Sequence, residues 1–310
     1  MEKKEKKFVG NSKAFSTILK VVGILLILMI IACLVKTCAE CNYKAHIVDK
    51  TGYLPTNDDW DNIPNVEPPY YDDDTLNLPK QVSLERYFPP IGDQGEKGTC
   101  VAWATGYNLK TALNAIDGHW TKEKLEQPSN QTSPQDLWLS IPQMQKGEDC
   151  SGTGFEAAFN VLTSSGVASM EEVPYENLKG CDGIGMGDTT NRLLDYCFVT
   201  RNGDLPKVGE LKAYLNDTIP LVIGAHLGDR FMRWKNDKVI NYDTYNYTGM
   251  HAYHAMALVG YDDSRQAFRL RNSWGTDWGD KGSIWVDYGF FCREFCFVVF
   301  MAKNGNPGSK

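Results

Sequence analysis

The apolar pattern of this sequence changes at Pro220, and this change limits the possible fold more than any other feature. Before it, apolar residues recur at helical spacing in residues 155–165 and 208–216, and Ser133 followed by Pro134 is a typical helix start. After it, short apolar runs are separated by Gly and Asp, which is typical of strands and turns. The runs are residues 221–223, 255–261, 267–270, 283–286 and 295–300. A chain that is helical first and β-rich second is predicted to have an α+β fold, with two subdomains and a cleft between them.

An apolar stretch at residues 14–35 separates a basic tail, residues 1–13, from the rest of the chain. At about 1.5 Å per residue, a helix of this length can cross the ~30 Å hydrocarbon layer of a membrane. The first twenty residues hold six Lys against two Glu, so the positive-inside rule predicts a cytoplasmic tail and a body in the periplasm or on the cell surface. Residues 30–33 also resemble a bacterial lipoprotein signal, in which Cys33 would be lipidated. Both interpretations predict a membrane-tethered body outside the cytoplasm.

The segment between this stretch and the body, residues 36–77, is acidic and rich in Pro, which predicts a spacer. The body is predicted to span residues 78–305, with a helical part over 78–200 and a β-rich part over 201–305. The 310 residues are 42% hydrophobic, which is enough for a substantial core, and their net charge is −7 in spite of the basic tail. Nucleic acid is therefore excluded as a partner, because binding phosphates needs clustered Lys and Arg.

Cys100 is the first candidate for chemistry. It follows a loop with three Gly at residues 92–98 and precedes apolar residues spaced three and four apart, which predicts that it lies at the start of a helix. There the unpaired N–H groups and the helix dipole favour the thiolate, the reactive form of Cys. Gln94, in the same loop, is placed to hydrogen-bond an oxyanion together with the N–H of Cys100. A lone Cys is otherwise an ordinary small apolar residue, so its function depends on the partners that the fold supplies.

His254 and Asn272 are the predicted partners. His254 begins one predicted strand and Asn272 follows the next, with a turn at residues 262–265 between them. In such a hairpin the two lie almost opposite each other, with Cβ atoms about 5 Å apart, so the amide oxygen can hold the imidazole in one tautomer. A thiol, an imidazole and an orienting amide form a Cys-His-Asn nucleophilic site. His251 is an alternative base, but it faces no orienting amide.

The segments that carry these residues resemble the papain-like cysteine proteases, in a bacterial-type, membrane-tethered form. The main similarities, in the family's order, are to its nucleophile segment, histidine strand and asparagine turn, at residues 94–104, 253–261 and 272–279. Weaker similarities are to its substrate loop and its mid-domain turn, at residues 150–154 and 173–175. Together the resemblance covers residues 78–302.

The resemblance implies a papain-like fold, with a helical subdomain, a β-barrel-like subdomain and the active-site cleft between them. It implies a cysteine endopeptidase that hydrolyses peptide bonds through an acyl-enzyme on Cys100. His254 would transfer protons, Asn272 would orient His254, and Gln94 would stabilise the oxyanion. Trp274 would shield the His254–Asn272 pair from water, which strengthens the pair in a drier site.

The resemblance also implies a peptide or protein substrate. No metal or cofactor is expected, because the pairs Cys292–Cys296 and Cys38–Cys41 each lack a second pair of ligands. Gly152 would line the substrate backbone, while Gly224 and Ala255 would border the pocket for the second residue before the cleaved bond. Because Gly and Ala have almost no side chain, we expect a deep, uncharged pocket that prefers Leu, Val or Phe to Arg or Asp. His226 lies near this pocket in sequence and would add a polar wall if it turned toward it.

Two departures from the family pattern concern cross-links and latency. Lys97 stands where many relatives have a Cys, so Cys150 lacks its usual partner. Cys150 and Cys181 bracket a helix and a turn and are candidates for a disulfide, although the sequence leaves their pairing, and that of Cys197, Cys292 and Cys296, open. Residues 36–77 are too few for the long helical pro-region of many relatives, so the means of avoiding premature activity stays open.

Two other functions are compatible with the same residues. A papain-fold amidase or transpeptidase acting on cell-wall or partner peptides would use an identical catalytic trio. A catalytically silent peptide-binding module would be expected to lack Cys100, His254 or Gln94, and all are present. The sequence gives no indication of the oligomeric state.

Overall fold

The computed structural model describes residues 20–29, 51–54, 77–175, 181, 183–244 and 252–305. The chain consists of two units, residues 1–46 and residues 47–310. In the first unit residues 20–29 are helical, with exposed apolar side chains such as Leu25 and Met29. Within the part of the chain that the structure describes, no helix combines the length and the apolar character needed to cross a membrane. The tail at residues 1–13, and the ends of the predicted anchor, lie outside the described residues.

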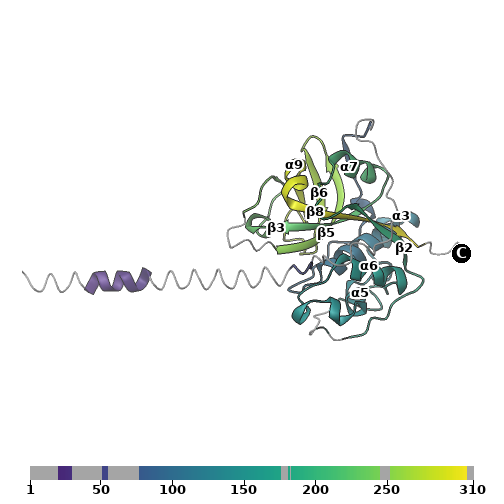
Figure 1. The fold of residues 1–310 in the computed structure, drawn as a ribbon, viewed down its shortest axis with the longest axis horizontal. Helices are drawn as coiled ribbons and strands as arrows, with labels where there is room; N and C mark the ends of the chain where they lie inside the picture. The colour runs from purple at the N-terminus through teal and green to yellow at the C-terminus, as the bar shows by residue number, and fades with distance from the viewer. Residues whose placement is uncertain are drawn as a thin grey trace, which may run out of the picture. The chain divides into compact units, whose positions relative to one another are not determined.

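Helices dominate the first half of the body, as the sequence predicts (Figure 1). The α-helices are α2 (Cys100–Ala102), α3 (Thr111–Asp117), α4 (Lys122–Leu125), α5 (Pro134–Ser140), α6 (Phe155–Ser164), α7 (Val208–Asn216), α8 (Asp229–Met232) and α9 (Tyr288–Phe290). Two π-helical stretches, η3 (Trp103–Lys110) and η7 (Phe291–Phe295), and four 3₁₀ turns, η2 (Glu85–Tyr87), η4 (Pro128–Asn130), η5 (Gln143–Gln145) and η6 (Glu148–Cys150), complete the helical elements.

Local signals account for several of these helix ends. The Ser133 side chain caps α5 by accepting a 3.0 Å hydrogen bond from the N–H of Asp136. After α6, Gly166 has a φ of +67°, a conformation that Gly adopts without a steric cost, and its N–H bonds to Val161. Helix α7 has the bounds predicted from its apolar spacing.

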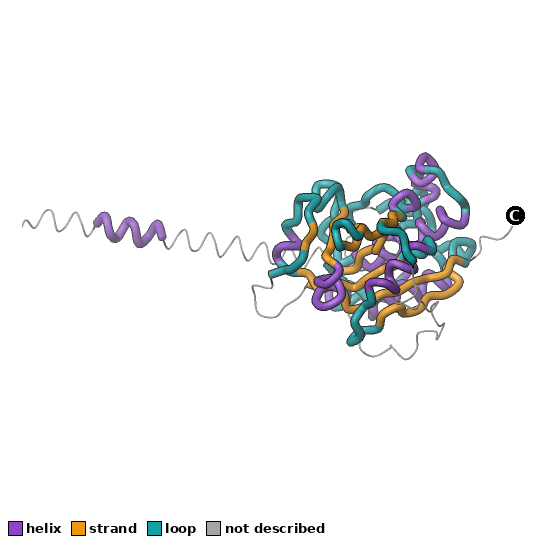
Figure 2. The backbone as a smooth tube through the Cα atoms, turned by 90° about the horizontal axis from the view of Figure 1, so that it is seen from above, coloured by secondary structure: helices purple, strands orange, loops and turns teal. Residues whose placement is uncertain are grey.

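In the described part of the body, eight strands form one sheet. Strand β1 lies near the start of the body, and the other seven lie in its second half. The strands are β1 (Gln81–Ser83), β2 (Leu193–Thr200), β3 (Leu221–Leu227), β4 (Val239–Ile240), β5 (Ala252–Asp262), β6 (Ala267–Arg271), β7 (Ser283–Asp287) and β8 (Cys296–Asn304). Their order is β2-β8-β3-β5-β6-β7-β4, with β1 paired to β5, so the sheet is open where the sequence predicted a barrel-like part. Figure 2 shows the strands gathered in the body with helices and loops around them.

The hairpin of β5 and β6 brings the predicted His and Asn together. Its ladder pairs Ala257 with Arg271 and is offset by a bulge between Leu258 and Gly260. Asn272 directly follows Arg271, and His254 lies three residues before Ala257 on β5.

Two apolar cores lie within the body, which confirms the predicted two-part α+β organisation. One core joins α2, α5 and α6 to β2 and β8, and the other lies among β3, β5, β6, β7 and α7. Strands β3 and β5 contribute to both, because successive side chains of a strand point to opposite faces. Val222 and Ala255 belong to the first core, while Ile223 and Met256 belong to the second. These two shared strands carry the predicted His254 and the predicted pocket residues.

Candidate active site

Cys100 is the first residue of α2, and α2, η3 and α3 follow one another without a break as far as Asp117. The cysteine side chain is fully buried. Burial raises the pKa of the thiol to about 12, although the N–H groups of Ala255, Val101 and Cys100 itself lower it. Burial thus opposes the thiolate predicted from the helix start, while the nearby N–H groups favour it.

His254 and Asn272 form a buried hydrogen-bonded pair. Nε2 of the imidazole is 2.7 Å from Oδ1 of the amide, which also accepts a 2.8 Å hydrogen bond from the N–H of Ser273. Since Oδ1 can only accept, the imidazole proton lies on Nε2 and Nδ1 carries a lone pair. Nδ1 is buried and has no hydrogen-bond partner among the described residues. Burial lowers the pKa of His254 to about 4, against the opposing effect of the bond to Asn272, so this Nδ1 is neutral and able to accept a proton.

The helix start and the histidine strand lie together. The first turn of α2 packs against β5. The N–H of Ala255 is close enough to the Cys100 sulfur to lower the pKa of the thiol, and Ala255 directly follows His254. The structure thus brings the predicted thiol to the end of β5 that carries the predicted base.

Gln94 is buried beside the asparagine turn. Its Oε1 accepts a 2.6 Å hydrogen bond from the hydroxyl of Ser273, and its backbone N–H bonds to the carbonyl of the same residue. Its Nε2 donates to the carbonyl of Lys97 at 2.7 Å and to that of Thr51 at 3.5 Å. The amide is therefore oriented with its donor group toward the loop that ends at Cys100.

Trp274 covers the His254–Asn272 pair. Its ring centroid is 4.7 Å from that of the imidazole, and only 8% of the residue is exposed. Trp278 and Phe231 pack around it with centroid distances of 5.3 and 5.6 Å. These rings cover the imidazole at the position where the resemblance places a shielding Trp.

The predicted substrate-contacting glycines lie on two sides of the site. A Cβ on Gly152 would lie 2.0 Å from the carbonyl oxygen of Gly52, so the backbones of these two residues are in direct contact. Gly224 pairs with Ala255 across β3 and β5, and a Cβ on Gly224 would lie 2.7 Å from the ring of Phe297. The space beside Gly224 is thus filled by an aromatic ring from β8, which makes this wall of the expected pocket flat and aromatic. The ring of His226 stacks on the same Phe297, with centroids 4.6 Å apart.

Two sets of residues near the site were not predicted. The Tyr175 hydroxyl donates to the carbonyl of Gln94 at 2.9 Å and is 2.8 Å from the hydroxyl of Thr99. Residues 51–54, within the predicted spacer, are instead packed into the body, and Thr51 and Tyr53 are buried there. Residues 173–175 resembled a family turn, but no periodicity in residues 51–54 indicates their position.

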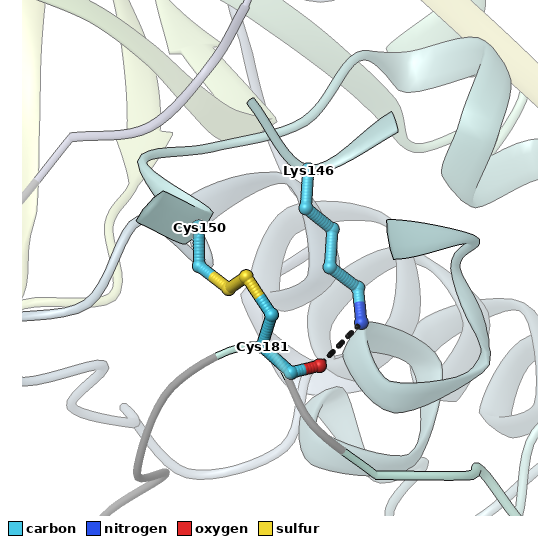
Figure 3. The surroundings of a disulfide bond; sticks show 3 residues. All are labelled: Lys146, Cys150 and Cys181. Atoms are coloured by element: carbon cyan, nitrogen blue, oxygen red, sulfur yellow. Dashed lines mark hydrogen bonds between the residues drawn. A yellow bond between two sulfur atoms is a disulfide. The ribbon is translucent and has the colours of Figure 1, made fainter. Parts of the chain in front are cut away.

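Cys150 and Cys181 are joined by a disulfide (Figure 3). The sequence alone left this pairing open. Lys146 lies beside it and donates a 3.4 Å hydrogen bond to the carbonyl of Cys181. Cys197, Cys292 and Cys296 are free thiols. His251, the alternative base, lies outside the described residues, and within the described part no three His, Cys, Asp or Glu side chains gather as metal ligands would.

Residues 78–296 match the sequence model described as "Papain family cysteine protease". The chain is 29% identical over 201 residues to gamete and mating-type specific protein A of Dictyostelium discoideum, covering 65% of this chain and 41% of that protein. It is also 29% identical over 229 residues to KDEL-tailed cysteine endopeptidase CEP2 of Arabidopsis thaliana, covering 70% of this chain and 56% of that protein. The chain thus spans about half of the length of these curated relatives.

Solved structures share the fold. Xylellain, a cysteine protease from Xylella fastidiosa, superposes with a TM-score of 0.62 at 22% identity, covering 83% of this chain and 97% of that chain. Procathepsin B S9 from Trypanosoma congolense gives a TM-score of 0.66 at 16% identity, with 84% of this chain and 89% of that chain covered. At these identities the comparisons establish the papain-like architecture.

Proposed function

The chain belongs to the papain family of cysteine proteases, and we propose that it hydrolyses peptide bonds through an acyl-enzyme on Cys100. One observation carries the assignment of roles. The His254–Asn272 hydrogen bond fixes the imidazole proton on Nε2 and leaves Nδ1 as a buried acceptor on the strand that packs against the thiol. A base in this state, next to a buried thiol at a helix start, is arranged for nucleophilic catalysis.

The proposed reaction has two proton transfers through His254. Nδ1 takes the thiol proton while the sulfur of Cys100 attacks the peptide carbonyl carbon, and a tetrahedral oxyanion forms. Nδ1 then gives this proton to the leaving amine as the C–N bond breaks, which leaves a thioester on Cys100. A water molecule, deprotonated by Nδ1, attacks the thioester and releases the acid, and the sulfur regains its proton. Asn272 keeps the imidazole oriented throughout.

The oxyanion would be held by Nε2 of Gln94 and the backbone N–H of Cys100. The hydrogen bond from the Ser273 hydroxyl to Oε1 of Gln94 fixes which side of the amide donates. A donor that is oriented before the reaction stabilises the developing charge without having to reorganise.

An endopeptidase is favoured over an exopeptidase by the position of residues 51–54. These residues lie against Gly152 and reach Gln94, yet they are internal to the chain and continue in both directions. A site that holds an internal segment does not require a free chain end, and this is the property that an endopeptidase needs.

We further propose that the body is tethered to a membrane and lies outside the cytoplasm. The apolar run at residues 14–35, the excess of Lys before it and the Cys150–Cys181 disulfide support this location, because structural disulfides persist in oxidising compartments.

The test of the catalytic proposal is the loss of Cys100. Cys100→Ala is expected to abolish hydrolysis of a fluorogenic peptide library and covalent labelling by a peptidyl epoxide, while its circular dichroism stays that of the wild type. Cys292→Ala, which removes another free thiol, is the control and should keep both activities. Wild-type turnover in Cys100→Ala would overturn the mechanism.

A further inference from the structure

A cavity lies between the residues that follow η2 and the region where α3 ends and α4 begins. Its volume is about 860 Å³, which is in the range of pockets that bind small molecules. Phe88, Pro90 and Ile91 line it from the first segment, and Trp120 and Leu125 line it from the second. None of the proposed catalytic residues is among the lining residues, so the cavity is not part of the site described above.

The walls of this cavity are mainly aromatic and aliphatic. Phe88 and Leu125 are buried, whereas Trp120 is partly exposed. The backbone N–H of Trp120 donates a 2.9 Å hydrogen bond to the carbonyl of Ala115, and Nζ of Lys124 lies 4.7 Å from the centroid of its ring, so the indole is held from two sides. Such walls favour a ligand with an apolar body, because binding removes apolar surface from water.

Arg271 brings a buried positive charge to the cavity. It is among the lining residues, yet only 6% of it is exposed. Nε donates a 3.1 Å hydrogen bond to Oδ1 of Asn108 and Nη2 donates to the carbonyl of Pro89, while Nη1 makes no hydrogen bond within the described part of the chain. Burial lowers the pKa of Arg271 to about 10, so the guanidinium is still charged at pH 7. Since both acceptors are neutral, this buried charge favours a ligand that brings a negative charge.

The acidic side chains that line the cavity are already paired. Glu85 accepts a 3.2 Å hydrogen bond from Nε of Arg269, and a carboxylate oxygen of Glu126 lies 3.7 Å from Nζ of Lys122. Arg86, an exposed residue, adds a second guanidinium to the lining. In the described part of the chain, neither this residue nor the buried arginine forms an ion pair with a carboxylate. Two positive charges of the cavity thus lack a negative partner among these residues.

We propose that this cavity binds an organic carboxylate with an aromatic or aliphatic body. The carboxylate lies between Arg271 and Arg86, and the apolar body packs against Trp120 and Phe88. Hydrogen bonds from a guanidinium to a carboxylate are roughly twice as strong as those between neutral groups, so the charge fixes one end of the ligand. A phosphate dianion fits less well, because the apolar walls do not solvate its second charge. The C-terminal residue of a peptide and a short fatty acid both have the proposed chemistry.

The first test is isothermal titration calorimetry of the full-length chain with two acids and their uncharged amides. The acids are N-acetyl-phenylalanine and hexanoate, and the amides are N-acetyl-phenylalaninamide and hexanamide. At least one acid should bind at least about tenfold more tightly than its amide, because hydrogen bonds to ionised groups are the stronger ones. If neither acid binds at millimolar concentration, or if each binds no more tightly than its amide, the proposal is overturned.

The same titrations separate the two sources of the carboxylate. Tighter binding of N-acetyl-phenylalanine than of hexanoate indicates the C-terminal residue of a peptide. Tighter binding of hexanoate indicates a fatty acid. Either result supports a carboxylate site.

The second test locates the site, because a carboxylate could also bind in the proposed catalytic cleft. Trp120→Ala should weaken binding of the preferred acid at least about tenfold, and Arg86→Gln about threefold, since an exposed charge contributes less. Arg201→Gln is the matched control. Arg201 is also exposed and lies 4.7 Å from the ring of Phe198, as Arg86 lies 4.5 Å from that of Tyr87, but it does not line the cavity.

Hydrogen–deuterium exchange of the wild-type chain gives a second location that needs no variant. Saturation with the preferred acid should slow exchange in peptides from residues 85–91 and 118–126, which contain most of the lining residues. Slower exchange only in the segments around Cys100 and His254 would overturn the proposal. So would wild-type affinity in a Trp120→Ala protein whose circular dichroism is that of the wild type.

Discussion

The hydroxyl of Ser273 donates a 2.6 Å hydrogen bond to Oε1 of Gln94, and this bond joins the asparagine turn to the loop that carries the nucleophile. The two segments are 179 residues apart in sequence, and both residues are buried. A second bond, from the N–H of Gln94 to the carbonyl of Ser273, makes the connection rigid. Gln94, the proposed oxyanion donor, and Asn272, the proposed orienting residue, are therefore fixed relative to each other.

Loss of Gln94 should accordingly cost more than loss of the residue that orients it. We expect Gln94→Ala to lower kcat by about 10²–10³-fold, which is typical for one oxyanion-hole donor, and Ser273→Ala to lower it by only about tenfold. Ser264→Ala, on an exposed turn, is the control. Steady-state kinetics with one fluorogenic peptide would measure kcat and KM of these variants. A change confined to KM in both variants would contradict the oxyanion role of Gln94.

Substitution of His254 and substitution of Asn272 should lower the activity by different amounts. His254→Ala removes the proton acceptor, so its activity should fall to that of Cys100→Ala. Asn272→Ala removes only the orienting bond, so measurable activity should remain. His119→Ala, which removes an exposed imidazole, should behave as the wild type. Activity in His254→Ala, supplied for example by His251, would overturn the assignment of the base.

Tyr175 is expected to position the nucleophile loop. Its hydroxyl links the carbonyl of Gln94 to the hydroxyl of Thr99, the residue before Cys100, and its ring packs edge-on against Trp103. The loop has Lys97 where many relatives have a cross-linking Cys, and Cys150 pairs with Cys181 instead, so this tyrosine supplies a link that a disulfide does not.

Tyr175→Phe keeps the ring and removes only the hydroxyl. We expect kcat to fall about five- to tenfold, the effect of about one hydrogen bond, with KM and the thermal midpoint nearly unchanged. Tyr242→Phe, on an exposed tyrosine, is the control. A thermal midpoint that falls in step with kcat would indicate a purely structural role.

The helices of the body were predictable because their signals are local. The Ser133 cap and the Gly166 stop define α5 and α6 within a few residues, and the strands after Pro220 have short, well-separated apolar runs. Strand β2 was not predicted, since its burial does not alternate. Leu194, the second residue of the strand, is 69% exposed, whereas most of the later residues are buried. The pairing of β2 with β8 is irregular at both ends.

The positions of the three proposed catalytic residues follow from local sequence features, whereas their protonation states depend on the whole fold. The helix start at Cys100 and the hairpin around residues 262–265 are local features, and together they bring the three side chains near one another. The pKa values of Cys100 and His254 depend instead on how completely the site is covered. That cover comes partly from residues 51–54, which are about fifty residues before the thiol and meet the site only through tertiary contacts.

The location of the body can be tested from the Lys distribution around residues 14–35. Protease added to intact cells or spheroplasts should digest the body, because the positive-inside rule places it outside the cytoplasm. Digestion only after lysis would contradict this orientation. Labelling with radioactive palmitate would test separately whether Cys33 is lipidated, and Cys33→Ser is the control for that label.

Stability should depend on pH through the neutral state of His254. The folded-state pKa of about 4 lies below the value near 6.5 expected in the unfolded chain, so between these values the unfolded state binds more protons. The free energy of unfolding should therefore fall as the pH drops from about 6.5 to 4, by about 3 kcal/mol from this group, and level off below. His254→Asn cannot titrate and should lack this component, although its stability at pH 7 will also change. Urea unfolding of both proteins at pH 7, 5 and 4 gives the free energy of unfolding as a function of pH. The difference between the two proteins in this pH dependence isolates His254 from the other titrating groups. Parallel curves for the two proteins would mean that the imidazole is already charged, or solvated, in the folded state.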